Sequence, residues 1–278
     1  MDLITRFPQK PKFLVGIDLD GTLLQSDQKV SDINRKALLE AQANGIAISL
    51  ISGRSHCGFL HYLHDLGILA PCAGDAGAII FDPISQEIFQ NTVMSTDQMR
   101  HILDQVQGGE ITAFLHDANT VIYNRESHTL RNYADVTPAC SYRLEPNLIQ
   151  NYAMEATKVA FIASSEVLTP LAERILAVEP SLELTWTSNY IIEINAAGAN
   201  KGAALHRIAK MLQVPPENTI AIGDSHNDYE MLRQAGVSVA VANAVDGAKD
   251  LADFISPSNE EDGVAWVLNQ LMQKGFLA

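Results

Sequence analysis

The chain has 278 residues, of which 47% are hydrophobic and 19% charged, and its 33 acidic and 19 basic residues give a formal net charge of −14. This length allows one large domain or two modest ones, the composition argues against disorder, and the acidic balance argues against binding nucleic acid or an anionic membrane. An anionic substrate would therefore need a local positive site, such as a metal ion with a few lysines or arginines.

The three cysteines, Cys57, Cys72 and Cys140, are widely spaced and form no C-x-x-C pair. This spacing predicts neither a disulfide framework nor a zinc site, and we expect buried free thiols in a reducing compartment. The first residues lack the apolar core of a signal peptide, and the longest apolar stretches, such as Gly45–Ile51, fall far short of the ~20 residues that span a bilayer. A cytoplasmic protein without a membrane partner is therefore predicted, and its oligomeric state is left open.

In the first part of the chain, short apolar runs alternate with helical patterns. Phe13–Ile17 is continuously apolar apart from one glycine, as expected of a strand that is buried on both faces. Ser31 can cap a helix that runs to Asn44 and ends at Gly45, and Ile46–Ile51 is a second buried strand.

The middle of the chain, from about Pro83 to Tyr190, has a higher polar content, and its strand candidates alternate between apolar and polar residues. Alternation is typical of an antiparallel sheet with one face exposed to water. The expected elements are strands at Thr120–Tyr123, Lys158–Ile162 and Glu183–Trp186, with helices at Thr96–Gln107 and Thr169–Val178. This part is interpreted as an α+β insert.

After the insert, buried strands and helices alternate again. The expected elements are a helix that begins at Lys201 and ends before Pro215, a strand at Thr219–Ile222, a helix that ends at Gly236, and a strand at Val237–Val241. Strands that alternate with helices predict an α/β fold, with helices on both faces of a parallel sheet. The predicted domains are a core of residues 1–82 and 191–278 and an inserted domain of residues 83–190.

The first predicted strand ends in Asp18-Leu19-Asp20-Gly21-Thr22. Two carboxylates that flank one apolar residue point the same way on an extended chain and could share a site. In a low-dielectric cleft they would repel each other unless a cation or a shared proton lay between them, and a hard divalent ion such as Mg²⁺ suits oxygen ligands. Gly21 allows a tight turn in which backbone N–H groups approach a phosphate. The same residues are equally typical of a plain strand followed by an Asp-Gly turn.

Three other segments place polar residues at strand ends or helix starts. Gly223-Asp224-Ser225-His226-Asn227-Asp228 offers two carboxylates, Ser52-Gly53-Arg54 offers groups that bind an oxyanion, and Lys201 follows a loop of small residues. Each segment alone is also typical of a capped helix or a solvated side chain. Because ligands bind open α/β sheets at the carboxyl ends of the strands, the combination predicts one shared site.

In this order the motifs resemble those of the haloacid dehalogenase superfamily of phosphatases, and most of all its Cof-like branch with a type IIB α+β cap. The likeness extends to Asn243-Ala244 and to residues 259–265, while Ser52 replaces a common threonine and Asp75-Ala76-Gly77 departs from the more usual asparagine-glycine. The resemblance implies a Rossmann-like parallel sheet core with an inserted α+β cap domain. It also implies a Mg²⁺-dependent phosphatase that hydrolyses small phosphorylated metabolites, sugar phosphates or similar phosphomonoesters, through an aspartyl-phosphate.

The resemblance also assigns roles to individual residues. Asp18 is the expected nucleophile, and Asp20 is the expected general acid and base. The expected Mg²⁺ ligands are Asp18, the backbone carbonyl of Asp20 and Asp224, with Asp228 behind them to orient metal-bound water or Lys201. The groups expected to hold the phosphate oxygens belong to Leu19, Ser52, Gly53, Lys201 and Asn227.

Three alternatives remain open at this point. A dehalogenase would have no use for Asp20 and Asp224, a phosphomutase would keep the phosphoryl group on its product, and a non-catalytic module that binds phosphometabolites would not require both Asp18 and Asp20. Release of phosphate with and without magnesium distinguishes them. The candidates for reading the leaving group are polar residues of the insert, each more typical of a solvated surface than of a specific contact: His116, Asp117, Arg125 and Arg131.

Overall fold

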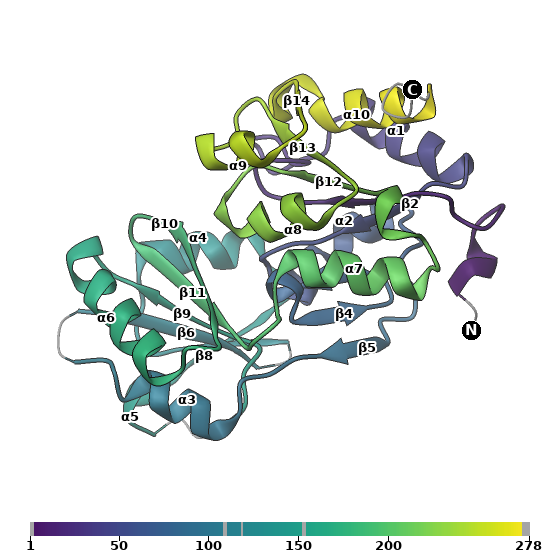
Figure 1. Ribbon diagram of the computed structural model, residues 1–278. Coiled ribbons are helices and arrows are strands. Elements are labelled where there is room, and N and C mark those ends of the chain that lie inside the picture. Colours follow the sequence, from purple (N-terminus) through teal and green to yellow (C-terminus); the bar gives the residue numbers. More distant parts are fainter. Residues whose placement is uncertain (1–2, 108–109, 118, 152–153, 274–278) are drawn as a thin grey trace.

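The computed structural model describes residues 3–107, 110–117, 119–151 and 154–273 (Figure 1). Its centre is a five-stranded sheet in the order β14-β13-β12-β1-β2, in which every neighbouring pair is parallel. The bounds of its strands are β1 (Leu14–Ile17), β2 (Ala47–Leu50), β12 (Thr219–Gly223), β13 (Val237–Val241) and β14 (Phe254–Ser256). The predicted α/β fold with a parallel core is therefore confirmed.

The strand order reverses between β1 and β12. From β1 the chain continues to β2 on one side, whereas from β12 it continues to β13 and β14 on the other side. Residues that follow β1 and β12 therefore lie next to each other at the carboxyl edge, at the kind of switch point where open α/β sheets bind ligands.

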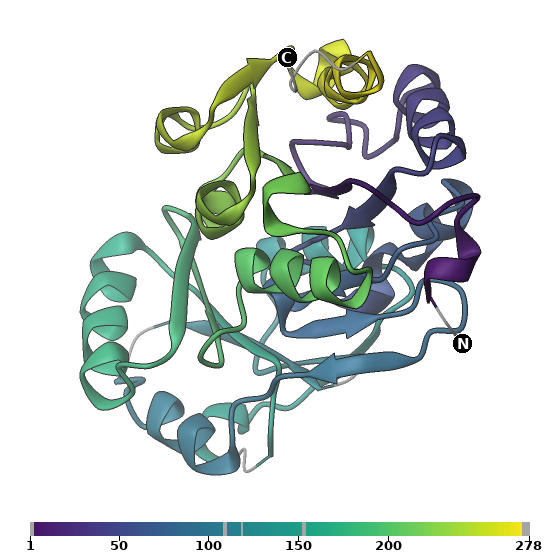
Figure 2. The same ribbon diagram turned by 45° about the vertical axis from the view of Figure 1, so that its right-hand side comes forward.

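Helices cover both faces of the parallel sheet, as Figures 1 and 2 show. One face carries α1 (Asp32–Ala43) and α10 (Gly263–Met272), and the other carries α7 (Lys201–Met211) and α8 (Tyr229–Gln234), with α9 (Asp246–Leu251) beside α8. The predicted helix start at Ser31 is confirmed, because its side chain accepts a hydrogen bond from the backbone N–H of Asn34 at 3.0 Å. Within the described residues, no helix combines the length and the apolar character needed to cross a membrane.

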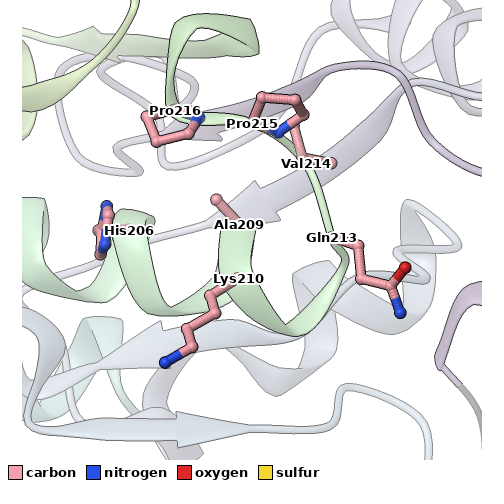
Figure 3. A pocket seen from close by; sticks show the side chains of 7 residues that line it. All are labelled: His206, Ala209, Lys210, Gln213, Val214, Pro215 and Pro216. Atoms are coloured by element: carbon pink, nitrogen blue, oxygen red, sulfur yellow. The ribbon is translucent and has the colours of Figure 1, made fainter.

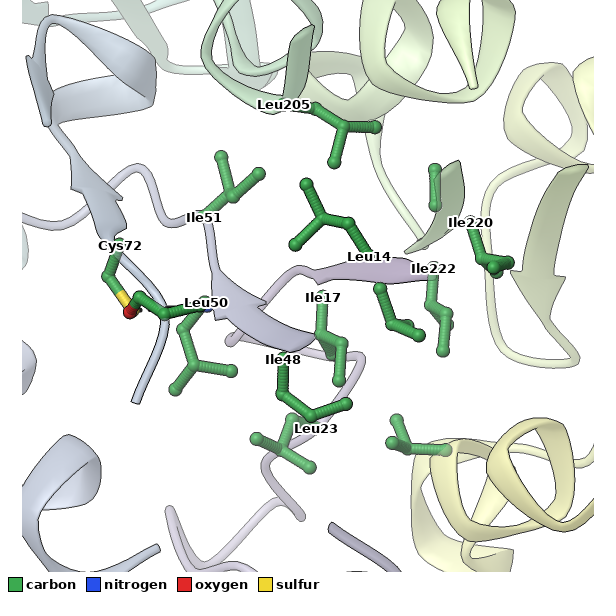
Figure 4. Close-up of a cluster of buried hydrophobic side chains, with 14 of the residues drawn as sticks. Leu14, Ile17, Leu23, Ile48, Leu50, Ile51, Cys72, Leu205, Ile220 and Ile222 are labelled. Carbon is green, nitrogen blue, oxygen red and sulfur yellow. Dashed lines mark hydrogen bonds between the residues drawn. The ribbon is translucent and has the colours of Figure 1, made fainter. Parts of the chain in front are cut away.

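Aliphatic side chains of the central strands fill the space between the sheet and its helices (Figure 4). Leu14 and Ile17 of β1, Ile48 of β2 and Ile222 of β12 are completely buried. Leu14 lies on the same side of the sheet as Leu205 of α7, whereas Ile17, Ile48 and Ile222 point to the opposite side. Burying each such side chain contributes about 1.5–3 kcal/mol. Apolar packing therefore fixes the register of β1 against β12, independently of the polar residues at the strand ends.

A small antiparallel sheet joins the edge of the parallel sheet, where Ile51 bridges Ala73. It consists of β3 (Cys72–Gly74), β4 (Ile79–Phe81) and β5 (Ile88–Asn91), and the short helix α2 (Leu60–Asp65) precedes it.

The inserted part forms a six-stranded sheet in the order β10-β11-β9-β6-β7-β8. Its strands are β6 (Thr112–Asp117), β7 (Thr120–Tyr123), β8 (Ser141–Leu144), β9 (Lys158–Ile162), β10 (Glu183–Ser188) and β11 (Ile191–Asn195). Its helices are α3 (Thr96–Leu103), α4 (His128–Val136), α5 (Leu148–Asn151) and α6 (Ser165–Val178). By strand pairing, β5 still belongs to the small sheet beside the core, and the sheet of the insert runs from β6 to the end of β11 at Asn195. Both ends therefore lie later in the chain than the boundaries predicted at 82/83 and 190/191, which stay predictions.

Two expectations about the inserted sheet are wrong. The sheet is not wholly antiparallel, because β7 and β8 pair in parallel. Its central strand β9 also has no wet face: Val159 and Phe161 pack against the apolar side near α3 and α6, while Lys158 and Ala160 on the opposite side are buried as well. The second face is buried because α4 and the core domain cover it.

The prediction of free thiols is wrong for two of the three cysteines. Cys57, which follows β2, forms a disulfide with Cys140, which follows α4, and their Cα atoms are 5.5 Å apart. Cys72 is free and buried, as expected. The two bonded cysteines belong to the core and the insert, respectively, and are 83 residues apart. Only the packing of one domain on the other brings them together, so their spacing in the sequence gave no signal.

Candidate active site

Three aspartates meet at the switch point of the parallel sheet. Asp18 directly follows β1, Asp224 directly follows β12, and Asp228 is the last residue of the short 3₁₀ helix η5 (His226–Asp228). One oxygen from each carboxylate lies within 4.8 Å of the other two. The structure thus brings together the two strand ends that the sequence placed at one site, and the carboxylate of Asp228 lies in the same cluster.

Lys201 is completely buried at the start of α7 and contacts two of these aspartates. Its Nζ lies 2.5 Å from Oδ1 of Asp18, 2.6 Å from Oδ1 of Asp228 and 3.2 Å from Oδ1 of Asn227. The other oxygen of Asp228 accepts hydrogen bonds from two backbone N–H groups of its own loop, both at 3.0 Å. Since both oxygens of Asp228 are already engaged, it is placed to orient Lys201.

The excess of buried negative charge shifts the pKa values at this site. Burial raises the pKa of Asp18 well above its usual value, and Asp228 and Asp224 raise it further, while Lys201 opposes them. Burial, and then Asp228, raises the pKa of Asp224 to about 6. Burial would lower the pKa of Lys201, but Asp18 and Asp228 raise it above its usual value. A divalent cation between Asp18 and Asp224 would favour the ionised form of both carboxylates, and such oxygen ligands suit magnesium.

Gly21 allows the turn after β1 to lie directly against Asp224. Its φ angle is +78°, and a Cβ atom at this position would come within 2.6 Å of Oδ2 of Asp224. Thr22 donates a hydrogen bond from Oγ1 to Oδ1 of Asp224 at 3.0 Å, and Asn243 donates one from Nδ2 to the carbonyl of Gly21 at 2.7 Å. Any larger residue at position 21 would push the turn away from Asp224, so both backbone conformation and space require glycine.

Asp20 lies at the rim of the site, where Arg54 holds it. The Asp20 side chain is 47% exposed, whereas that of Arg54 is 3% exposed. Nε of Arg54 donates to Oδ2 of Asp20 at 2.8 Å and Nη2 donates to Oδ1 at 2.5 Å. Arg54 also donates to the carbonyl of Val136 at the end of α4 at 2.7 Å, and to the side chain of Gln28. The sequence suggested Arg54 as a ligand for an oxyanion, but the structure shows it orienting Asp20 instead.

The remaining groups predicted to hold phosphate surround the aspartates. Within the described part of the chain, the backbone N–H groups of Leu19 and Gly53 donate to no protein acceptor. Ser52 is fully buried and its Oγ accepts a hydrogen bond from the Arg54 backbone at 3.0 Å, which leaves its own hydroxyl hydrogen able to donate. Asn227 contacts Lys201 through its oxygen, so its amide nitrogen is also available as a donor.

A cavity of about 240 Å³ opens above Asp18 and Asp20. Its core wall includes Gly53, Arg54, Asp224, Ser225 and Asn227. The opposite wall belongs to the inserted domain and consists of Tyr133 of α4, Thr187 of β10 and Glu193 of β11. The sequence analysis did not identify these three side chains, because they lie on separate elements of the insert and only the packing of the insert on the core places them opposite Asp18.

The insert residues that the sequence did suggest do not line this cavity. Arg125 and Arg131 are 44% and 70% exposed and pair with nearby glutamates, as solvated surface residues do. Asp117 ends strand β6 outside the cavity. His116 is buried, and its Nδ1 lies 2.5 Å from Oδ1 of Asp75, behind the wall that contains Tyr133.

Lys158, another residue the sequence analysis missed, joins the inserted domain to the loop after β2. Its Nζ donates to the carbonyl of Gly53 at 2.6 Å and to Oε2 of Glu193 at 2.6 Å. The Lys158 side chain is only 1% exposed. A lysine that begins an otherwise apolar strand was a signal in the sequence, since buried lysines are rare unless they are paired.

A second cavity, of about 340 Å³, lies at the far end of α7 from Lys201 (Figure 3). Its wall includes His206, Lys210 and Gln213, together with the Pro215-Pro216 turn. It contains no carboxylate, so it lacks the groups needed for the chemistry that the aspartate cluster can perform.

Comparison with known proteins agrees with this geometry. The family model described as haloacid dehalogenase-like hydrolase matches residues 15–268. The chain belongs to this family. It is 31% identical over 261 residues to the 5-amino-6-(5-phospho-D-ribitylamino)uracil phosphatase YcsE of Bacillus subtilis, a match that covers 92% of this chain and 96% of that protein.

Solved structures of haloacid dehalogenase-like hydrolases share the fold. One from B. subtilis is 27% identical with a TM-score of 0.82, and the match covers 93% of this chain and 99% of that one. A subclass IIB sugar phosphatase is 18% identical with a TM-score of 0.81, and the match covers 94% and 99% of the two chains. The resemblance to Cof-like phosphatases with a type IIB cap is thus confirmed, and this haloacid dehalogenase-like hydrolase is a phosphatase that acts on phosphorylated small molecules.

Proposed function

We propose that this phosphatase is Mg²⁺-dependent and hydrolyses small phosphorylated metabolites, sugar phosphates or similar phosphomonoesters, through an aspartyl-phosphate on Asp18. The observation that carries the proposal is the buried cluster of Asp18, Asp224 and Asp228 around Lys201, at the carboxyl edge of the parallel sheet. YcsE is named for a substrate in which a ribityl chain carries the phosphate. That name supports polyol and sugar phosphomonoesters as the substrate class for this chain.

The residues present suit Mg²⁺. The donors are all oxygens, and the pKa values of Asp18 and Asp224 are raised because burial and the neighbouring aspartates outweigh the opposing charge of Lys201. Asp18, Asp224 and the backbone carbonyl of Asp20 would hold the ion, while Asp228 keeps Lys201 in place. When bound, Mg²⁺ supplies charge neutralisation at a phosphoryl oxygen and favours the ionised form of Asp18.

Asp18 and Asp20 carry the bond changes. An oxygen of Asp18 attacks phosphorus, and the bond from phosphorus to the leaving oxygen breaks as Asp20 donates a proton to that oxygen. Asp20 then takes a proton from the water that attacks the phosphoryl group, which returns Asp18 to its free form. Arg54 aims Asp20 through both carboxylate oxygens, and the exposed side of Asp20 faces the cavity.

The other groups of the site hold the phosphoryl oxygens that do not react. Lys201 provides positive charge next to Asp18, and the free backbone N–H groups of Leu19 and Gly53 provide donors. The hydroxyl of Ser52 and the amide of Asn227 complete this set. Donors that are fixed before the reaction stabilise the charge redistributed in the transition state without having to reorganise.

The test is release of inorganic phosphate by the purified chain from sugar phosphates and from p-nitrophenyl phosphate, with Mg²⁺ and with a chelator. We expect release that requires Mg²⁺ and that Asp18→Asn abolishes while the variant stays folded. A phosphomutase would instead return the phosphoryl group on an organic product. Substantial Mg²⁺-dependent turnover by Asp18→Asn, shown to be free of deamidation, would refute the proposed role of Asp18.

A further inference from the structure

The wall of the active-site cavity that belongs to the inserted domain has a consistent chemical character. We infer that Glu193, with Thr187 and Tyr133, selects a leaving group that donates hydrogen bonds and carries no second negative charge, and that Glu193 is the main specificity-determining residue. This inference rests on the proposed function and specifies its substrate class further. Among the residues that the structure describes, every cation near the cavity is already paired, whereas the free polar atoms in this wall are acceptors or hydroxyls.

The cations near the cavity are fully engaged by the protein. Arg54 donates to both oxygens of Asp20, to the side chain of Gln28 and to the carbonyl of Val136. Lys158 is buried between the carbonyl of Gly53 and the carboxylate of Glu193. A carboxylate or second phosphate on the leaving group would therefore find no unpaired cation among the described residues of the inserted domain's wall.

Lys201 does not change this balance. Its ammonium group has three hydrogens, and three side-chain oxygens surround it, from Asp18, Asn227 and Asp228. It is completely buried beneath the aspartates and is not part of the cavity wall. Lys201 can act on the phosphoryl group at Asp18, but the leaving group lies on the other side of the cavity, against the inserted domain.

The free polar atoms in the wall favour hydrogen-bond donors. Glu193 uses Oε2 for Lys158, and its Oε1 accepts no hydrogen bond from the described residues. Thr187 has a buried Oγ1 for which the described part of the chain offers no partner. Leaving a buried polar atom such as Oγ1 of Thr187 without a partner is costly, so a ligand that satisfies it gains binding energy. Hydroxyl groups of a polyol or a sugar fit both atoms.

Tyr133 completes the wall as a neutral hydroxyl. Its oxygen lies 3.3 Å from the backbone N–H of Ser55, which donates to it, and 3.3 Å from Nε2 of His116. His116 in turn contacts Asp75, which fixes the ring behind Tyr133. Burial raises the pKa of Tyr133 well above its usual value, so the phenol stays protonated at neutral pH. Tyr133 can therefore hydrogen-bond to a leaving-group hydroxyl without adding charge.

A negatively charged leaving group would meet Oε1 of Glu193, the oxygen that Lys158 does not contact. Placing like charges together in a partly buried site can cost several kcal/mol, and the pairing of Glu193 with Lys158 reduces this cost, whereas a neutral hydroxyl there gains a charge-assisted hydrogen bond. The geometry therefore favours phosphomonoesters of neutral polyols or amino alcohols over phosphorylated sugar acids and bisphosphates of the same length.

The test compares matched substrates that differ only in this charge. Sorbitol 6-phosphate and 6-phosphogluconate form a six-carbon pair, and glycerol 3-phosphate and 3-phosphoglycerate form a three-carbon pair. We expect kcat/KM to favour the polyol in at least one pair by about tenfold or more. Glu193→Gln should shrink that preference by about tenfold, through a gain for the acid and a loss for the polyol. Thr187→Val removes a hydroxyl without changing charge, and should raise KM for the polyol without improving the acid.

Glu173→Gln, an exposed glutamate on α6, is the matched control and should leave both ratios unchanged. If the wild type hydrolyses p-nitrophenyl phosphate but has no preference for the polyol in either pair, or if Glu193→Gln leaves both ratios unchanged, the inference is wrong while the proposed function stands. If the wild type releases phosphate from none of these esters with Mg²⁺, the proposed function fails and the inference fails with it. If the Glu193→Gln variant does not fold, the wild-type preference for the polyol and the KM of Thr187→Val test the inference in its place.

Discussion

Arg54 offers a sharp test of how the site is held together, because it connects Asp20, the proposed general acid, to both domains. Its guanidinium donates to both oxygens of Asp20, at 2.8 and 2.5 Å, and to the carbonyl of Val136 in the inserted domain at 2.7 Å. Arg54→Lys keeps the positive charge but loses the planar fork that fixes the carboxylate. Losing one charge-assisted hydrogen bond of about 2 kcal/mol corresponds to a fall of roughly 30-fold in rate if its whole effect falls on the transition state.

The assay is steady-state hydrolysis of p-nitrophenyl phosphate at saturating Mg²⁺, with thermal unfolding measured in parallel. We expect kcat to fall by about 30-fold or more in Arg54→Lys, while KM changes little, because Arg54 contacts Asp20 and not the phosphate. Arg233→Lys, at an exposed arginine of α8 that pairs with Glu230, is the control and should behave like the wild type. A kcat for Arg54→Lys within about threefold of wild type would show that Asp20 does not need this orientation.

Three further predictions follow from the same contacts. Asp20→Asn should bind orthovanadate as the wild type does while kcat falls by about 10²–10⁴-fold, and an unchanged kcat would remove Asp20 from the mechanism. Burial would raise the pKa of Asp75, but His116 and Thr157 hold this pKa below its usual 3.8. The ionised carboxylate therefore stabilises the fold above pH 3.8, and this stabilisation is lost as the pH falls through the lowered pKa. Asp75→Asn should therefore lower the free energy of unfolding, measured with urea, by about 3 kcal/mol near neutral pH and by less below about pH 4. An equal loss at the two pH values would show that the charge of Asp75 does not stabilise the fold. Cys140→Ser should lower the free energy of unfolding by up to about 4 kcal/mol, and dithiothreitol should destabilise the wild type but not the variant; equal effects on both would show that the disulfide does not form.

The core of the fold was predictable because its strands are continuous apolar runs. Strands β1, β12 and β13 lie where the sequence placed them, to within one residue at each end. A strand of a parallel sheet is buried on both faces, so nearly all of its residues are apolar. A continuous apolar run in the sequence is therefore enough to predict such a strand. The carboxylates of Asp18 and Asp224 were predictable for a related reason, since polar residues at the ends of buried strands must meet at one edge of the sheet.

The cavity wall could not be predicted in the same way. Glu193 looks like an ordinary polar residue of an alternating strand, and only the packing of the insert on the core turns it toward Asp18. The same packing buries the second face of β9 and pairs Cys57 with Cys140, and both results contradicted the expectation from local pattern. Local periodicity reports the environment within one domain, whereas these features depend on contacts between two domains.

The central claim is that Asp18 receives the phosphoryl group beside a Mg²⁺ ion shared with Asp224. A crystal structure of the chain with Mg²⁺ and trifluoroberyllate tests it most directly. We expect beryllium bonded to a carboxylate oxygen of Asp18, and Mg²⁺ bound by Asp18, the Asp20 carbonyl and Asp224. Beryllium on any other side chain, or Mg²⁺ bound without Asp224, would contradict it.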